Sequence, residues 1–225
     1  MRKFLALVAF SAMLAVAAFA ADTSATKRLD QASTVIQQMT TGSAGIPDSV
    51  LKDAKCIAVV PGLVKGAFIV GAEHGDGVAT CRTSNGWSAP AFFKVSGGSF
   101  GAQIGGQKTD LVMMIMNEQG MDALMKGHFK VGAEASGAAG PVGREAAASG
   151  GWKAAILTYS RSKGAFAGVD LNGAELHTDT EAMSSLYNQP VTFQQALQGT
   201  VPPPPQATAF LQTIQNARAT AASNQ

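Results

Sequence analysis

Charged residues are scarce in this 225-residue sequence, at 14%, and cysteine, histidine, tryptophan and tyrosine are scarcer still. Lysine and arginine number 17 against 15 aspartates and glutamates, so the strongly basic balance of a nucleic-acid-binding protein is missing. The three histidines, His74, His128 and His177, lie at predicted turns or strand ends and have no Cys-x-x-Cys or His-x-x-x-His partner. We therefore expect neither nucleic acid nor a metal ion as a ligand.

Motifs for catalysis and for cofactors are missing as well. No serine stands in a Gly-x-Ser-x-Gly motif, and the acidic residues are too scattered to predict an acid and base pair. The glycine-rich stretch 97–106 lacks the Gly-Lys-Ser/Thr of a phosphate-binding loop, and its glycines are typical of strands that turn and pack closely. The sequence therefore predicts a protein without enzymatic activity, catalytic residues or cofactors.

One long apolar run is present, at the N-terminus. Arg2 and Lys3 precede the run, which extends over residues 4–19 and ends in the small residues that a signal peptidase requires, up to Ala20. The run is shorter than a membrane-spanning helix. We expect residues 1–20 to be a cleaved secretion signal and the protein to be exported to the periplasm. Without Arg2 and Lys3 the 17 basic residues fall to 15, equal to the acidic residues.

Only two cysteines are present, Cys56 and Cys81, and neither lies just after the cleavage point, where a lipoprotein would carry its lipid anchor. Export would place them where disulfides persist. A bridge would stabilise the fold by roughly 3 to 4 kcal/mol in the chain-entropy model. The alternative is two buried thiols that act as small hydrophobic side chains.

The order of the predicted elements favours one α+β domain. Helical periodicity predicts short helices at 26–39 and 48–55, and later at 118–126, 180–186, 193–197 and 207–222. Between them lie short apolar segments separated by glycine, which predict strands at 57–60, 67–72, 78–82, 87–95, 99–104, 110–116, 129–135, 152–159, 165–171 and 174–177. Their turns are predicted at Asp76-Gly77, Asn85-Gly86, Gly97-Gly98 and Asn172-Gly173.

These strands predict a mainly antiparallel, barrel-like sheet flanked by short helices. We assign residues 21–188 to this domain, including its N-terminal amphipathic helix. Residues 189–225 contain four consecutive prolines and then a helix, and we expect them to form a peripheral helical appendage.

The helix at 26–39 is the first candidate binding element. It carries an apolar stripe that includes Leu29, Ile36 and Met39, with Lys27 and Arg28 beside it. One interpretation is that the stripe packs on the domain. The other is that the stripe enters a membrane surface among acyl chains while Lys27 and Arg28 contact phosphates.

Two further segments are candidates for contact with an anion. Backbone amides in the small-residue run 136–144, beside Arg144, would suit a phosphate headgroup, although a close-packed structural turn is the alternative. Arg161, Lys163 and Lys153 would make a basic rim, or would be solvated charges in a hairpin turn.

Taken together, several ordered segments resemble the SYLF domain family. The resemblance extends over residues 27–188 and is carried by Ile46–Pro61, Phe68–Gly71, Gly86–Phe92, Gly97–Gly105, Thr109–Val112, Ala138–Arg144 and Tyr159–Val169. It implies a module that binds phospholipid membranes, with phosphoinositides bound by eukaryotic members, actin bound by fungal relatives, and no catalysis. It also implies lipid contact by an N-terminal amphipathic segment. The cysteine pair is not part of the shared pattern.

Export from a bacterium departs from these expectations, because neither actin nor phosphoinositides would be met there. We therefore expect a lipid-binding protein peripheral to an envelope membrane, with anionic phospholipid as its partner. The lipid-binding residues would be Lys27, Arg28, Leu29, Ile36, Met39, Arg144, Arg161 and Lys163. The alternative is a structural or protein-interaction module with an envelope protein partner and only incidental lipid contact.

Overall fold

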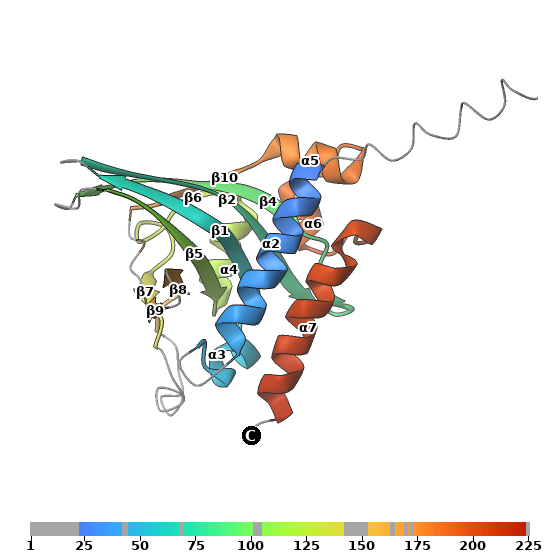
Figure 1. Ribbon diagram of the computed structural model, residues 1–225. Helices are drawn as coiled ribbons and strands as arrows, with labels where there is room; N and C mark the ends of the chain where they lie inside the picture. The colour runs from blue at the N-terminus through green and yellow to red at the C-terminus, as the bar shows by residue number, and fades with distance from the viewer. Residues whose placement is uncertain are drawn as a thin grey trace, which may run out of the picture.

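The structure is a computed structural model that describes residues 23–41, 45–67, 70–100, 105–141, 153–162, 165–168, 171 and 173–223. Within these residues, a ten-stranded sheet has the order β6-β10-β4-β2-β1-β5-β8-β7, with β3 beside β2 and β9 beside β8. All pairs are antiparallel except β7 with β8. The sheet curls strongly into a half-barrel (Figure 1), which confirms the predicted α+β class.

The strands differ more from the sequence prediction than the helices do. The strands are β1 Cys56–Ala67, β2 Val70–Thr83, β3 Gly86–Trp87, β4 Ala91–Phe100, β5 Gly105–Ile115, β6 His128–Lys130, β7 Gly137–Ala139, β8 Ile156–Ser162, β9 Ala165–Gly168 and β10 Glu175–Thr178. The helices are α2 Thr23–Thr40, α3 Asp48–Asp53, α4 Glu118–Met125, α5 Thr180–Tyr187, α6 Phe193–Leu197 and α7 Thr208–Ser223, with a 3-10 turn η2 at Pro205–Ala207.

Two predicted turns are wrong, because β2 and β4 each run straight through the glycines. Gly77 pairs with Phe93 across the two strands, and a Cβ atom on Gly77 would lie 2.3 Å from Cζ of the Phe93 ring. Gly97 similarly lies against the side chain of Glu73. These glycines make room for a neighbouring side chain instead of turning the chain. The turn before Gly86, which has a φ of 111°, is confirmed.

Helices α2 and α7 lie side by side across the sheet (Figure 1). α2 contacts the strands β1, β2 and β5, and the short helix α3 also contacts α7. On α7, Phe210 is 1% exposed and Ile214 is fully buried, and both belong to the same hydrophobic core as the sheet. The segment that we expected to be a peripheral appendage therefore supplies part of the core.

The covering helices begin at residues that cap them. Asn117, Asp179 and Thr192 each accept a hydrogen bond from a backbone N–H in the first turn of α4, α5 and α6 respectively. The helix predicted at 118–126 is confirmed, and Gly127 follows it with a φ of 69°, as expected after a helix end.

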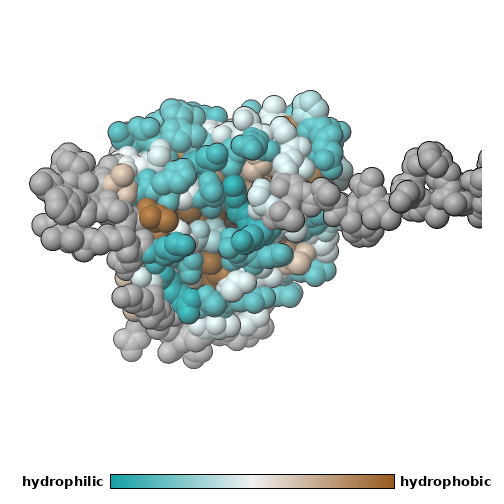
Figure 2. Space-filling model, turned by 45° about the horizontal axis from the view of Figure 1, so that its top comes forward, coloured by the Kyte–Doolittle hydropathy of each residue, from teal (hydrophilic) through white to brown (hydrophobic). Residues whose placement is uncertain are grey.

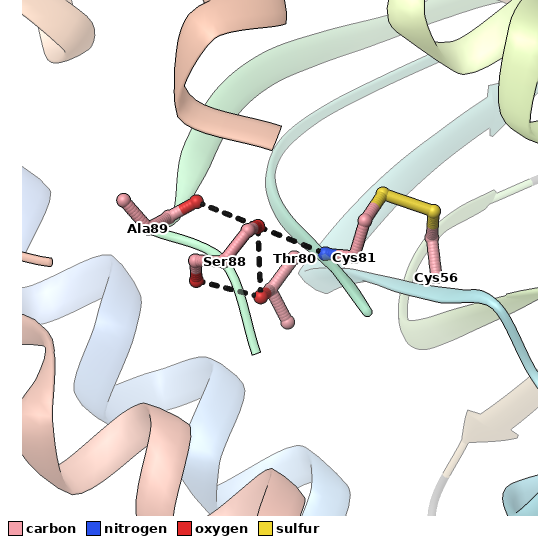
Figure 3. Close-up of a disulfide and its surroundings, with 5 residues drawn as sticks. All are labelled: Cys56, Thr80, Cys81, Ser88 and Ala89. Carbon is pink, nitrogen blue, oxygen red and sulfur yellow. Dashed lines mark hydrogen bonds between the residues drawn. A yellow bond between two sulfur atoms is a disulfide. The ribbon is translucent and has the colours of Figure 1, made fainter. Parts of the chain in front are cut away.

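A disulfide joins Cys56 to Cys81, which are direct cross-strand partners on β1 and β2 (Figure 3). A buried hydrogen-bond network lies next to the bridge. Ser88 Oγ accepts from Cys81 N at 3.0 Å and donates to Ala89 O at 3.0 Å, while Thr80 Oγ1 donates to Ser88 O at 2.9 Å. The network fastens the end of β2 to the chain that leads into β4. The predicted bridge is confirmed.

Candidate functional site

The apolar stripe of α2 is part of the core. Leu29 is 1% exposed, and Ile36 and Met39 are fully buried. The helix packs against α7, α5 and three strands, so in this conformation these side chains do not reach a membrane. Of the two interpretations of this helix, packing on the domain is the one that the structure presents.

Arg28 lies on the side of α2 that meets the sheet and is only 12% exposed. Its Nη2 is 3.0 Å from Oδ2 of Asp179 and 3.8 Å from Oδ2 of Asp76, and its Nη1 donates to Gly77 O. The guanidinium also lies 5.1 Å from the centre of the Phe92 ring. Asp179 is 4% exposed, so this pair of charges is mostly removed from water. Arg28 therefore holds α2 in place and is not free to contact lipid phosphate.

Arg161 ties β8 to α2. One of its Nη atoms donates to Oε1 of Gln38 on α2, and it lies 4.0 Å from Oδ2 of Asp110 on β5. Asp110 in turn accepts from Gly62 N at 2.9 Å, at the irregular part of β1. Arg144 and Lys163, the other members of the predicted basic set, lie outside the described residues. Lys153 is exposed.

The first part of the small-residue run is a strand. Gly137–Ala139 form β7, Gly140 N donates to Thr158 O at 2.9 Å, and Ser136 Oγ accepts from Ala155 N. A Cβ atom on Gly140 would lie 2.2 Å from Cζ of Tyr159, so the tyrosine ring packs directly on this glycine. Burial raises the pKa of Tyr159. Up to Pro141 the run is close-packed backbone, and the predicted phosphate-binding part lies outside the described residues.

Beside α2 the sheet leaves a broad part of one face uncovered, which we call the open face. Directly opposite residues on antiparallel strands point to the same side of a sheet. Six such residues make one row across β5, β1, β2, β4, β10 and β6, in the order Lys108, Val64, His74, Ser96, Glu175 and Lys130. All are exposed or partly exposed, and Val64 is 44% exposed.

A second row runs alongside, through Asp76, Lys94, His177 and His128. The rings of His128 and His177 are 5.0 Å apart, and His177 Nε2 lies 2.9 Å from Ser96 Oγ. The open face thus gathers all three histidines of the sequence. Sequence analysis missed this convergence because it placed each histidine at a separate turn or strand end, whereas His74 lies within a long strand.

The charges of the open face are only partly compensated. Lys130 lies 3.5 Å from Glu175, and Lys94 lies 3.8 Å from Asp179. Lys108 is exposed and forms no ion pair with the side chains that the structure describes. Three lysines (94, 108 and 130) and the carboxylates of Asp76 and Glu175 thus lie on the open face. Asp179, the partner of Lys94, lies at its border, and Lys108 is the lysine left without an ion pair among the described side chains.

Lys27 lies on the solvent side of α2, the helix that borders the open face. It is exposed and lies on the same side of the helix as Gln31, Thr34 and Gln38, because these positions are three to four residues apart. Gln38 in turn contacts Arg161 on the sheet. Of the predicted lipid-binding residues within the described part of the chain, Lys27 is the most accessible to a flat partner.

The surface is mostly hydrophilic on the side that Figure 2 brings forward, and hydrophobic residues show there only as separate spots. Val64 is the one large hydrophobic side chain classed as exposed in the part of the chain that the structure describes. No helix within that part is long and apolar enough to cross a membrane. Its His, Cys, Asp and Glu side chains form no group of three or more arranged to hold a metal ion. The geometry suits contact with a polar or charged surface.

Fold and surface together define a single-domain α+β protein. Helices cover part of one face of its half-barrel sheet. A family model described as Ysc84, Las17-binding protein actin regulator, matches residues 96–217, more than half of the sequence. The chain belongs to this family, which confirms the resemblance to SYLF proteins. No solved structure matches significantly.

Curated relatives agree with this assignment. LAS seventeen-binding protein 3 of Saccharomyces cerevisiae is 35% identical over 71% of this chain and 36% of its own length. Protein YSC84 of the same yeast is 34% identical over 76% of this chain and 38% of its own length. The human SH3 domain-containing YSC84-like protein 1 is 34% identical over 72% of this chain and 48% of its own length. The chain thus spans less than half the length of these relatives.

Proposed function

We propose that this chain is a non-enzymatic protein of the bacterial envelope that binds anionic phospholipid surfaces peripherally and reversibly through the open face and Lys27. The observation that carries the proposal is the exposed double row of polar side chains, in which lysines outnumber carboxylates. Lysines near an anionic membrane each contribute about 1 kcal/mol of attraction, which salt screens. Among the described residues Val64 is the only exposed large apolar side chain, so we expect electrostatic contact with little insertion.

The disulfide supports the envelope location. Cys56 and Cys81 are bridged between the first two long strands, and such bridges persist in oxidising compartments such as the periplasm. The predicted secretion signal, residues 1–20, lies outside the described residues and supports the same location from the sequence.

Co-sedimentation with vesicles tests the proposal. The chain without residues 1–20 would be mixed with phosphatidylcholine vesicles, or with vesicles that also contain phosphatidylglycerol, at low and at high salt. We expect binding to the anionic vesicles alone, which weakens as salt rises. The double variant Lys27→Glu/Lys108→Glu should bind about tenfold more weakly or worse, because two attractive charges become repulsive.

The matched control is Lys126→Glu, which reverses an exposed charge at the end of α4, outside the two rows. Lys126 lies 3.3 Å from Glu134, and surface pairs of this kind contribute at most about 1 kcal/mol. Equal loss of binding in Lys126→Glu and in the single variant Lys108→Glu, which changes the net charge by the same amount, would overturn the assignment to the open face. Absence of binding to both vesicle types would overturn the lipid-binding role itself.

A protein partner is the second candidate, and the comparisons favour it, since the family model is described as Las17-binding and one relative is named LAS seventeen-binding protein 3. We place this candidate surface on the exposed side of α7, at Gln212, Gln215 and Asn216. Truncation would be a poor test because Phe210 and Ile214 are in the core. Charge substitutions at the three exposed positions should reduce capture of envelope proteins without changing stability, and unchanged capture would exclude this surface.

A further inference from the structure

Two of the three histidines on the open face are direct neighbours on adjacent strands. His128 on β6 is the antiparallel partner of His177 on β10. Thr178 N donates to Gly127 O beside them, so the two histidines occupy positions that are not hydrogen-bonded to each other. Side chains at such positions approach more closely than those at the hydrogen-bonded positions, and here the ring centres are 5.0 Å apart.

The separation of the two rings suits shared coordination of one metal ion. A metal–nitrogen bond of about 2.1 Å places an imidazole centre about 3.2 Å from the ion, so two imidazoles at ligand angles of roughly 90° to 109° have centres about 4.5 to 5.2 Å apart. The observed 5.0 Å lies within this range, and the ring planes are inclined by 30°. Each ring can turn about its χ2 bond to direct a nitrogen at the ion, because that torsion is broad and the turn hardly moves the ring centre. The two strands therefore need not move.

A hydroxyl group on the neighbouring strand orients one of the two rings. Nε2 of His177 lies 2.9 Å from Oγ of Ser96 on β4. When Nε2–H donates to this oxygen, Nδ1 is the nitrogen with a lone pair, because a neutral imidazole carries one proton. Metal-binding histidines nearly always donate their second nitrogen to such a partner, which fixes the tautomer and the orientation of the ring. Ser96 therefore lies where an orienting group is needed.

The charges around the pair are compatible with a bound cation. Lys94 is the cross-strand partner of His177, and its ammonium lies 3.8 Å from the buried carboxylate of Asp179. Lys130 on β6 lies 3.5 Å from Glu175. Both lysines of β4, β6 and β10 thus have a carboxylate beside them. The two imidazoles are exposed or partly exposed, so an ion can reach them from solvent.

We propose that His128 and His177 form a binding site for one divalent transition-metal ion at the margin of the open face, with Ser96 as the residue that positions His177. Imidazole nitrogen suits Zn²⁺, Ni²⁺ and Cu²⁺, and Cu²⁺ binds a given set of ligands most tightly of the three. His177 would bind through Nδ1 while its Nε2–H donates to Ser96. Two protein ligands leave the other positions of the ion to water, so the site is a surface chelate and not a closed structural centre.

This site goes beyond the proposed function and does not depend on it, because no lipid takes part. The spacing of the histidines in the sequence does not predict it, since the two ligands come from strands that only the fold makes neighbours. Metal binding can therefore be measured without vesicles, and its failure would leave the lipid-binding role untouched.

Binding would fasten an outer strand of the sheet. β6 lies at one end of the strand order and, among the described strands, pairs with β10 alone. An ion held by one histidine from each strand links the two, and a ligand that binds only the folded protein stabilises it. Val131 N donates to Ala174 O at the far end of this pairing, and Thr178 N donates at the near end. We expect hydrogen exchange of both amides to slow when Zn²⁺ is added.

Calorimetric titration with copper(II) chloride measures the affinity of the site. The chain without residues 1–20 would be titrated at neutral pH with glycine as a competing ligand, and we expect one tightly bound ion per chain. The variants His128→Gln and His177→Gln should each bind Cu²⁺ about tenfold more weakly or worse, because a single imidazole loses the advantage of a second ligand held nearby. Unchanged affinity in both variants would overturn the proposal.

The matched control is His74→Gln. His74 lies on the same open face, but its cross-strand partners are Val64 and Ser96, so no second imidazole lies opposite it. The variant should bind Cu²⁺ as the wild type does. An equal loss of affinity in this variant and in the two pair variants would show dispersed surface binding and would overturn the proposal.

NMR of the wild type provides a test that needs no variant to fold. Zn²⁺ should shift the ring signals of His128 and His177 together and leave those of His74 in place. Mg²⁺ at the same ionic strength should shift none of them, because it prefers oxygen ligands. Equal shifts at all three histidines, or equal shifts with both ions, would contradict the site.

The role of Ser96 is tested by removing and restoring its hydroxyl group. Ser96→Ala should weaken Cu²⁺ binding about tenfold, as loss of an orienting partner commonly does, while Ser96→Thr should retain the wild-type affinity. The ratio of one ion per chain should stay the same in both variants. Full affinity in Ser96→Ala would overturn the positioning role and, with it, coordination through Nδ1 of His177.

Discussion

Nη2 of Arg28 lies 3.0 Å from Oδ2 of Asp179, and the two residues are separated by 151 positions in the sequence. The pair joins the start of α2 to the residue that caps α5, where Asp179 also accepts from Ala182 N. The residue that sequence analysis assigned to lipid phosphate thus has its charge satisfied within the fold. Its neighbour Lys27 points outward.

Arg28 and Lys27 should consequently behave very differently when neutralised. Arg28→Gln leaves the 4%-exposed Asp179 without its closest cation and should lower the free energy of unfolding by about 3 kcal/mol. Lys27→Gln should change it by less than about 0.5 kcal/mol. Urea unfolding of the two variants measures the difference, and equal stabilities would contradict a structural role for Arg28. For the same reason, variants for the vesicle experiments should substitute Lys27 and leave Arg28 unchanged.

The two tyrosines differ in whether their buried hydroxyl groups form a hydrogen bond. Tyr187 Oη donates to Pro90 O at 2.6 Å, whereas the covered hydroxyl of Tyr159 has no partner among the described residues. Tyr187→Phe should therefore cost about 1 kcal/mol at pH 7, while Tyr159→Phe should be neutral or stabilising. The reverse order in urea unfolding would contradict these contacts.

Burial raises the pKa of both phenols, so the fold favours their neutral form. The stability that this contributes is fully present below about pH 10, the ordinary pKa of tyrosine, and is lost as the pH rises above it. Each Tyr→Phe variant should therefore lose less stability between pH 9 and pH 11 than the wild type does. An unchanged slope would show that the phenol in question titrates normally.

The disulfide should be present in protein purified without reductant. Thiol titration of the denatured, unreduced chain should detect no free thiol at Cys56 or Cys81, and detection of two would contradict the bridge. The double variant Cys56→Ala/Cys81→Ala should lose about 3 to 4 kcal/mol of unfolding free energy, mainly because its unfolded chain is less constrained. Chemical reduction of the wild type should produce a similar loss.

Gly77 should resist even the smallest side chain. Gly77→Ala places a Cβ atom against the Phe93 ring, and overpacking of this kind costs about 1 to 3 kcal/mol. Phe93→Leu in the same chain should recover part of the loss, so that the double variant is more stable than the sum of the single changes predicts. Strict additivity in thermal or urea unfolding would show that the glycine is required for another reason.

The last helix should unfold together with the sheet. Ile214→Ala removes fully buried methyl groups from α7 and should cost about 2 to 5 kcal/mol, whereas Gln215→Ala on the exposed side should have little effect. The loss should appear in a single cooperative transition, followed by both tryptophan fluorescence and circular dichroism. Two separate transitions would indicate that α7 is an independent appendage.

Local pattern predicted much of the fold, because periodicity and capping residues act over a few positions. The apolar run 110–116 was correctly assigned to a strand, and the helix that ends before Gly127 has the expected bounds within one or two residues. Glycine was the main source of error. Whether Gly77 turns the chain or admits the Phe93 ring depends on a partner strand that a single sequence does not identify.

The candidate site was less predictable, since it depends on which strands become neighbours. His74 and His177 belong to β2 and β10, which β4 separates in the sheet, and only the strand order brings their side chains to one surface. The amphipathic pattern of α2 is compatible with a buried stripe and with a membrane-bound one, because both environments are apolar.

Because α2 is the first described helix and α7 the last, their contact makes completion of the fold wait until residues 208–223 have been made. A chain that emerges from a ribosome or a translocation pore N-terminus first presents Leu29, Ile36 and Met39 before residues 208–223 are available to pack beside them. Until then the side of α2 that packs on α7 stays uncovered, even where the sheet has already formed. A chaperone that binds apolar helices would have its longest opportunity at α2, and the docking of α7 would end it.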